Sequence, residues 1–297
     1  MFQRILAAVD DSTRMWLVMQ AGRALAERAG GELLVLRVRA DDSQRDDVTD
    51  RDADLAEQTR ALRTQGRAAH YLLCVGAPEK HIIETARYQR STLIIIASRR
   101  DGPRTLPQRR MTARLAAHAR TPVLVVPERE ASGDEGLTGL FGAGNAPLLV
   151  ALDGSTLAEQ ALPYAAQMAT LLDRPLALVY VALPLLTQDE LAAAWAYVEG
   201  VRRRVRATIS RDLHIDAQVV SGAPVEELLW SAEGRRAAAI ALTAHGKSGL
   251  TSRRASPIAL ETIRHAPVPV LIIPTPVLAE GAAERAAMSG GQRGAEP

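Results

Sequence analysis

The feature that most constrains the fold of this chain is an internal repeat. Three segments of the first half recur in the same order in the second half, at offsets of 143, 146 and 147: 5–13 in 148–156, 75–78 in 221–224, and 121–127 in 268–274. Three ordered matches with so little drift indicate a tandem duplication. A chain built this way must fold as two similar units, each with a core of its own.

Each half alternates short apolar runs with helical segments. In the first half, strands are predicted at 5–9, 33–38, 69–75, 93–97 and 122–127. Helices are predicted at about 12–29, 55–64, 79–89 and 111–118, and the acid-rich segment 41–54 is predicted to be a loop. Strands that alternate with helices favour a parallel sheet covered on both faces. The predicted fold class is therefore α/β, with two doubly wound units.

The boundaries of these units follow from composition. We predict domains at 1–127 and 147–275, joined by a linker at 128–146 that is rich in Gly, Glu and Ser. Residues 276–297 contain few large apolar residues, so we expect a disordered tail there.

Composition excludes several classes of protein. The apolar and charged fractions, 47% and 24%, are typical of a globular protein, and the formal net charge of +2 is too small to favour nucleic acid or an anionic membrane as partner. The only cysteine, Cys74, excludes an internal disulfide and is interpreted as a buried small hydrophobe. The N-terminus has no signal-peptide layout, and no apolar run approaches the ~20 residues of a membrane span. We expect a cytoplasmic protein.

One segment of the second half has the pattern of an anion site. An apolar strand at 239–242 leads into a loop that contains Gly246 and Gly249, followed by a predicted helix at 256–265 and a strand at 269–274. Glycines allow the backbone to approach a ligand closely, and the free N–H groups at a helix start favour phosphate oxygens. This βαβ unit is a candidate phosphate cradle.

The residues alone leave the roles of several side chains open. Asp153 could hold a ribose hydroxyl or a magnesium ion, and it could equally cap the following helix together with Ser155, since both roles can coexist at a switch point. Lys247 and Arg253 either neutralise phosphates or are solvated surface. No pairing of nucleophile and base is identifiable from spacing, and neither a Walker loop nor a metal-binding cluster is present, so no catalytic residue is predicted.

The matched segments resemble the universal stress protein family in its tandem form. The resemblance rests on a first strand that ends in Asp-x-Ser, on Gly-x-Pro before the third helix, and on a Pro-Val-Leu last strand, in both halves. It implies a five-stranded, Rossmann-like parallel sheet of order 3-2-1-4-5 in each half. It also implies binding of ATP or a related adenine nucleotide, a role in stress responses, and usually no catalytic activity. Members of the family often pair through their last strands, which implies an intramolecular pseudo-dimer here and a possible homodimer.

The family's nucleotide motif, Gly-x2-Gly-x9-Gly-Ser/Thr, is partly kept in the second half. Thr243 stands at the first glycine and Gly246 at the second, and after nine residues Ser256 and Pro257 stand at the Gly-Ser pair. The resemblance also implies that Asp153 and Val181 contact the nucleotide, with Mg²⁺ as a possible companion. The implied binding residues are Ala151, Asp153, Val181, Thr243, Gly246, Lys247, Ser248, Arg253, Ser256 and Ile258.

The same frame in the first half keeps no motif glycine. It places Ala97 and Arg100 at the first two glycines, and Arg110 and Met111 at the end of the loop. Nucleotide binding is therefore expected mainly in the second half, with the first half as a structural or regulatory partner. The alternative hypothesis is an interaction scaffold that binds no nucleotide in either half, which the missing glycines favour.

Overall fold

The first half of the chain forms an alternating series of strands and helices. The computed structural model describes residues 2–10, 15–39, 49–98, 106–127, 137–142, 144–182, 184, 186–209, 212–246 and 255–274. The elements of the first half are β1 (Arg4–Val9), α1 (Met15–Ala29), β2 (Glu32–Arg39), α2 (Thr49–Thr64), β3 (Ala69–Val75), α3 (Pro78–Tyr88), β4 (Leu93–Ser98), α4 (Leu106–His118) and β5 (Val123–Pro127).

The second half repeats this series after a short helix. Its elements are α5 (Leu137–Phe141), β6 (Leu148–Leu152), α6 (Thr156–Glu159), α7 (Leu162–Leu172), β7 (Leu176–Ala182), α8 (Gln188–Thr208), β8 (Ile215–Ser221), α9 (Pro224–Gly234), β9 (Ala239–Thr243), α10 (Pro257–His265) and β10 (Val270–Ile273).

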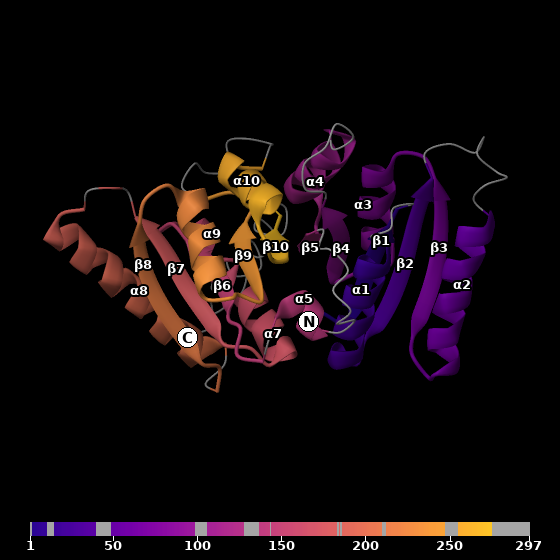
Figure 1. Ribbon diagram of the computed structural model, residues 1–297, viewed down its shortest axis with the longest axis horizontal. Coiled ribbons are helices and arrows are strands. Elements are labelled where there is room, and N and C mark those ends of the chain that lie inside the picture. The colour runs from indigo at the N-terminus through magenta and orange to yellow at the C-terminus, as the bar shows by residue number, and fades with distance from the viewer. Residues whose placement is uncertain are drawn as a thin grey trace, which may run out of the picture.

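The strands form one continuous sheet across both halves (Figure 1). Its order within the described residues is β3-β2-β1-β4-β5-β10-β9-β6-β7-β8. Each half has the order 3-2-1-4-5 with parallel neighbours, so the predicted fold is confirmed. Where the halves meet, β5 and β10 run antiparallel, with Leu124 opposite Leu271. The expectation that the two last strands lie side by side is confirmed as well.

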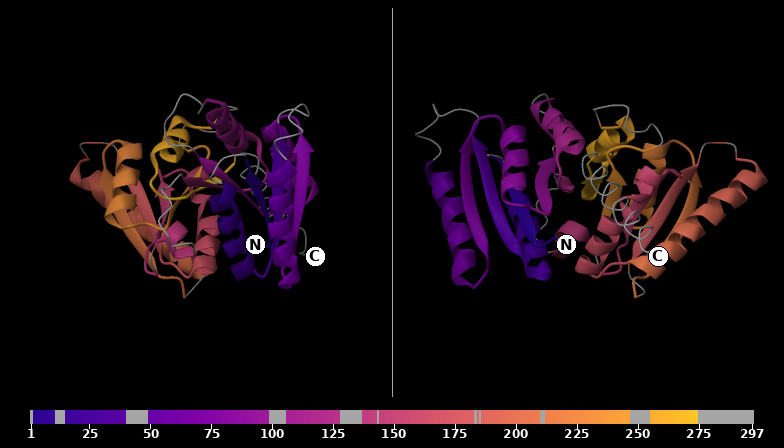
Figure 2. Two further views of the ribbon diagram at one scale, coloured as in Figure 1. Left: turned by 45° about the vertical axis from the view of Figure 1, so that its right-hand side comes forward. Right: turned by 180° about the vertical axis from the view of Figure 1, so that it is seen from behind.

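Hydrophobic packing on both faces explains why the central strands read as unbroken apolar runs. Ile94 and Ile95 of β4 have no exposed surface, and they belong to two different clusters of buried residues on opposite faces of the sheet. Successive side chains of a strand point to opposite faces, so a strand covered by helices on both sides needs apolar residues at every position. Figure 2 shows these helical layers from two further directions.

Helix α2 begins earlier than its sequence predicts. It starts at Thr49, within the segment expected to be a loop, rather than at about residue 55. Asp52 in its first turns accepts hydrogen bonds from Arg37 of β2 and from the Tyr71 hydroxyl of β3, at 2.6 Å each. Acidic side chains near a helix N-terminus are also favoured by the helix dipole. The prediction of a loop was therefore wrong for residues 49–54, where Asp52 anchors the helix to the sheet, and its remaining part at 41–48 lies outside the described residues.

The predicted linker contains a buried helix. Helix α5 lies within residues 128–146, and its Leu140 and Phe141 join the hydrophobic core. A five-residue helix has too little local periodicity to be predicted, and it is stabilised by packing rather than by propensity. Helix α4 similarly begins at Leu106, five residues before the predicted start. The expected disordered tail at 276–297 lies outside the described residues.

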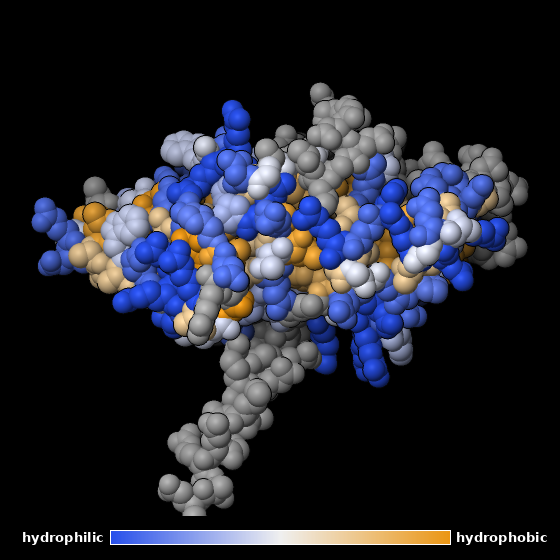
Figure 3. Space-filling model, turned by 90° about the horizontal axis from the view of Figure 1, so that it is seen from below, coloured by the Kyte–Doolittle hydropathy of each residue, from blue (hydrophilic) through white to orange (hydrophobic). Residues whose placement is uncertain are grey.

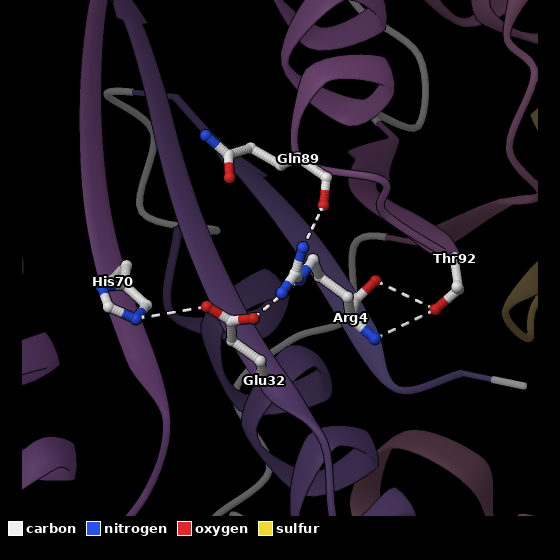
Figure 4. Close-up of polar contacts among 5 residues, drawn as sticks. All are labelled: Arg4, Glu32, His70, Gln89 and Thr92. Carbon is white, nitrogen blue, oxygen red and sulfur yellow. Dashed lines mark hydrogen bonds and ion pairs between the residues drawn. The ribbon is translucent and has the colours of Figure 1, made fainter.

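A polar cluster joins the first three strands at the amino end of the sheet, opposite to the end where ligands bind in such folds (Figure 4). Arg4 at the start of β1 donates to Glu32 of β2 and to the backbone carbonyl of Gln89, at 2.7 Å each. Glu32 also lies 3.2 Å from His70 of β3, and the Thr92 hydroxyl accepts from the Arg4 N–H. The cluster keeps β1, β2 and β3 in register.

No helix in the part of the chain that the structure describes is long and apolar enough to cross a membrane.

Candidate functional site

A cavity of about 800 Å³ opens at the carboxyl ends of β6, β7 and β9. Strand β6 pairs with β7 on one side and with β9 on the other, so the order of the strands in the sheet reverses at this point. Such switch points leave a crevice between the strand ends, where open α/β sheets bind ligands. The cavity is lined by seven of the ten predicted residues: Ala151, Asp153, Val181, Thr243, Gly246, Ser256 and Ile258. The other three, Lys247, Ser248 and Arg253, lie outside the described residues.

Asp153 supports the start of helix α6 through Ser155. Its Oδ1 accepts from the Ser155 N–H at 2.9 Å and from the Ser155 hydroxyl at 2.6 Å. Ser155 in turn is the N-cap, since its Oγ accepts from the Ala158 N–H at 3.1 Å. The capping alternative is thus present in the structure, with Ser155 as the cap and Asp153 as its support. A role of Asp153 toward ribose or Mg²⁺ stays a prediction.

Gly246 is packed against the Asp153 carboxylate. A Cβ atom at this position would overlap Asp153 Oδ2, so any other residue would displace that side chain. Gly246 is not among the glycines with a left-handed backbone conformation. The need for glycine here therefore comes from close contact with another side chain, and not from an unusual φ angle.

The start of α10 uses most of its own hydrogen-bonding groups. Ser256 is the N-cap: its Oγ accepts from the Ala259 N–H at 3.2 Å, and its N–H donates to the Ala244 carbonyl at 2.8 Å. Pro257 follows at the first helical position and has no N–H to offer. The Thr243 hydroxyl donates to the His245 carbonyl. These contacts shape the loop ends, and they reduce the number of donors that face the cavity.

The described wall of the cavity carries negative rather than positive charge. Asp153 and Glu190 line it, and no lysine or arginine is among the described lining residues. Glu190 accepts from the backbone N–H and the hydroxyl of Thr187, and these hydrogen bonds lower the pKa of Glu190. Burial, followed by the nearby carboxylates of Glu159 and Asp153, raises the pKa of Tyr197 well above its usual range, so this phenol is neutral.

The sequence matches the universal stress protein family over residues 1–127 and 145–274. The chain belongs to that family. The two matched segments are the two halves of the sheet.

Solved structures agree with the family at the level of the fold. A universal stress protein from Archaeoglobus fulgidus DSM 4304 has a TM-score of 0.68 at 20% identity, covering 92% of this chain and 97% of that one. A putative universal stress protein from Pseudomonas aeruginosa UCBPP-PA14 has a TM-score of 0.67 at 17% identity, covering 96% and 98%. The cytoplasmic domain of a prokaryotic cation chloride cotransporter has a TM-score of 0.58 at 15% identity, covering 94% and 99%. No curated protein sequence matches the chain.

In this universal stress protein the cavity also includes residues that sequence reasoning missed. They come from the end of β7, from the connection that follows it and from the first half of α8: Tyr180, Leu186, Glu190, Ala193, Ala194 and Tyr197. One signal was available, because Thr187-Gln188-Asp189-Glu190 has the capping-box pattern, and the structure shows both of its hydrogen bonds. That pattern marks where α8 begins but gives no indication that the helix borders a cavity.

The corresponding place in the first half has a smaller cavity among the described residues. Its cavity measures about 210 Å³ and is lined by two carboxylates, Asp10 and Glu79, and by apolar side chains that include Met111. Of the residues that stand at the motif positions in the first half, Ala97 and Met111 line the cavity. Arg110 is exposed and is not among the described lining residues, and Arg100 lies outside the described part of the chain.

Proposed function

We propose that this universal stress protein takes part in a stress response by binding an adenine nucleotide, such as ATP, in its second half. The observation that supports this proposal is the 800 Å³ cavity at the β6–β9 switch point, where seven of the predicted residues converge. Its volume lies within the range of small-molecule sites, and its walls are mostly apolar with a few polar groups, as such sites usually are. The apolar walls suit an adenine ring, and the Asp153 carboxylate suits the ribose hydroxyls.

The phosphates are assigned to residues outside the described part of the chain. Lys247 and Ser248 follow Gly246 directly in sequence, and Arg253 comes seven residues after it, so the segment next to Gly246 contains positive charge and a hydroxyl. A Mg²⁺ ion would accompany the phosphates of ATP and offset their charge. The described wall needs such cations, because Asp153 and Glu190 repel an anionic ligand.

The first half is proposed to bind no nucleotide. Its cavity of about 210 Å³ lies below the usual size of ligand sites, and Asp10 and Glu79 give it negative charge. Glu79 already pairs with Arg114 of α4. We propose that this half is a structural partner that forms an intramolecular pseudo-dimer with the second, through β5 and β10.

The proposed activity is binding in the cytoplasm rather than catalysis. The serine and threonine hydroxyls that reach the described part of the cavity have structural partners: Thr243 donates to a backbone carbonyl, and Ser256 caps α10. Neither is paired with a base that would activate it as a nucleophile.

One observation favours the alternative hypothesis of a scaffold without nucleotide. Phosphate sites at helix starts depend on several free N–H groups. At α10, Pro257 has none, while the Ser256 and Ala259 N–H groups already donate to protein oxygens. A scaffold would need no such donors.

Native mass spectrometry of the full chain, purified from cells without added ligand, tests the proposal. We expect a bound adenine nucleotide at a stoichiometry of one per chain. A stoichiometry of two would show that the first half also binds. Ligand-free protein that also fails to bind ATP in a calorimetric titration would support the scaffold.

Titration of the Arg253→Ala variant tests the phosphate assignment. If Arg253 contacts phosphate, we expect its loss to lower the affinity for ATP at least tenfold and to leave the affinity for adenosine unchanged. Equal affinities of the variant and the wild type for both ligands would place Arg253 on solvated surface.

A further inference from the structure

The cavity of the second half extends to both faces of the sheet. Ala151 and Val181 belong to the side covered by α9 and α10, where the other predicted nucleotide contacts from α10 also lie. Leu152 and Tyr180, one position away along the same strands, point to the face covered by α8, and they line the cavity too. We call the part on this second face the α8 lobe, lined by Leu152, Tyr180, Leu186, Glu190, Ala193, Ala194 and Tyr197.

The walls of the α8 lobe are mostly apolar and aromatic, with one carboxylate. The rings of Tyr180 and Tyr197 contact each other with centroids 5.5 Å apart and an angle of 59° between their planes. The nearest carboxylate of α8, Glu190, is occupied by its hydrogen bonds to Thr187. Aromatic walls of this kind bind aromatic and aliphatic groups by surface burial and ring contacts. The chemistry of the lobe therefore suits an uncharged apolar group.

In the first half, the corresponding position between the sheet and α2 is occupied by an ion pair. Arg37 of β2 occupies the position that corresponds to Tyr180, and its side chain, only 2% exposed, pairs with Asp52 of α2 at 2.6 Å. The Tyr71 hydroxyl, from β3, donates to the same carboxylate. These contacts tie the first turns of α2 to the sheet, and no residue of α2 is among the described residues that line the first-half cavity.

The second half has different residues at the two sheet positions that hold Asp52 in the first half. Tyr180 stands in place of Arg37, and Ala217 stands in place of Tyr71 at the matching register position. The first turns of α8 project beyond the edge strand β8 in two opposite views (Figures 1 and 2), and Leu191 and Trp195 on this part of the helix are about 40% exposed. Seen from below, hydrophobic residues reach the surface at the end of the molecule where α8 lies (Figure 3). The space between α8 and the sheet therefore stays open, and it is continuous with the nucleotide part of the cavity.

We propose that the α8 lobe is a second binding subsite, which takes an uncharged aromatic or acyl group while the nucleotide occupies the rest of the cavity. Only the second part of this statement rests on the proposed function. The lobe itself is assigned from its own walls and from the contrast with the first half. The two groups are carried on one ligand or on two, and in either case both are bound at the same time.

Fluorescence titration of the full chain with N-phenyl-1-naphthylamine, an uncharged aromatic probe that brightens in apolar surroundings, tests this subsite. We expect one probe per chain. Ala193→Trp places an indole in the lobe and should lower the affinity for the probe at least tenfold. Ala192→Trp is the matched control, because Ala192 is an exposed neighbour on α8 that does not line the cavity. Its affinity for the probe should stay within twofold of the wild type.

Titration with AMP completes the test. We expect saturating AMP to leave the probe bound. A probe that binds Ala193→Trp as tightly as the wild type, or that AMP displaces one for one, would overturn the separate subsite. Absence of AMP binding in the wild type would instead overturn the proposed function. The affinities of the Ala193 and Ala192 variants for the probe would still show whether the lobe is a binding subsite. Thermal unfolding of both variants shows whether they keep the fold, as the exposure of both positions leads us to expect.

Discussion

Single residues at the β6–β9 junction are held in place by contacts with one another. Asp153 fixes Ser155, Ser155 caps α6, and Gly246 leaves room for the Asp153 carboxylate. A change at Gly246 would therefore reach the ligand indirectly, through Asp153. The sequence alone indicates that glycine lets the backbone approach a ligand at this position. In the structure, an added side chain would first meet the Asp153 carboxylate.

Substitution of Gly246 tests this arrangement. Gly246→Ala should displace Asp153, weaken ATP binding at least tenfold, and lower the free energy of unfolding by about 1–3 kcal/mol. Gly234→Ala is the matched control, since a Cβ atom there would meet nothing within 4 Å. It should leave affinity unchanged and raise stability by at most about 1 kcal/mol. Calorimetric titration and urea unfolding measure both quantities, and wild-type affinity in Gly246→Ala would show that Asp153 does not contribute to binding.

Two partly buried phenols should make the free energy of unfolding fall in alkaline solution. Burial is the largest cause that raises the pKa of Tyr71 and of Tyr197 above the ordinary value of 10.0, and carboxylates nearby raise each further. The unfolded chain loses these protons above about pH 10 while the folded chain keeps them. The free energy of unfolding should therefore be constant with respect to these groups below pH 10, and fall above it by up to about 1.4 kcal/mol per pH unit for each group.

Urea unfolding between pH 9 and pH 11.5 measures this slope. The double variant Tyr71→Phe/Tyr197→Phe should show a shallower fall than the wild type. Tyr88→Phe, at a position that is 79% exposed, should leave the slope unchanged. An identical slope in the double variant would assign the alkaline loss to other groups.

Among the elements, the pair β5–β10 has the largest consequence for the fold. Both strands are edges of their own five-stranded units, and an unpaired apolar edge invites aggregation. Pairing with each other covers both edges at once, so these strands are apolar along their length. The outer edges β3 and β8 are partly exposed instead.

A charge placed in β10 should be far more costly than one at an outer edge. Leu271 has no exposed surface, so Leu271→Asp should lower the free energy of unfolding by about 4 kcal/mol or more, or prevent folding. Val75→Asp in the edge strand β3, at a position that is 45% exposed, should cost about 1 kcal/mol or less. Urea unfolding compares the two, and similar losses would argue against a buried β5–β10 junction in solution.

At the scale of the whole molecule, the continuous sheet couples the halves. The two clusters of buried residues each contain side chains from both halves, so unfolding one half would expose the core of the other. We therefore expect both halves to unfold in a single cooperative transition. A ligand bound in the second half alone would then stabilise the first half too.

Tryptophan fluorescence can follow each half separately, because Trp16 lies in the first half and Trp195 and Trp230 lie in the second. The variant Trp16→Phe reports the second half, and the double variant Trp195→Phe/Trp230→Phe reports the first. At ATP concentrations 100-fold above the dissociation constant, the free energy of unfolding should rise by about 2.7 kcal/mol in both. A rise confined to the second half would show that the halves unfold independently.

The sequence by itself determined the architecture. The repeat, the apolar strands and their alternation with helices predicted two doubly wound units, because burial on both faces leaves a local signature in every central strand. Most predicted strand bounds lie within one residue of those observed, as at β3, where residues 69–75 match. The seven candidate residues that the structure describes all line one cavity, because the carboxyl ends of neighbouring parallel strands meet at one edge of the sheet.

Only the tertiary structure decided the rest. The early start of α2, the helix inside the linker and the reason for glycine at position 246 each depend on a contact between distant segments: Asp52 with Arg37 and Tyr71, Phe141 with the core, and Gly246 with Asp153. The α8 lobe depends on contacts that one half makes and the other does not. Local sequence reports which residues prefer burial, but which side chains meet is determined by packing across the whole sheet.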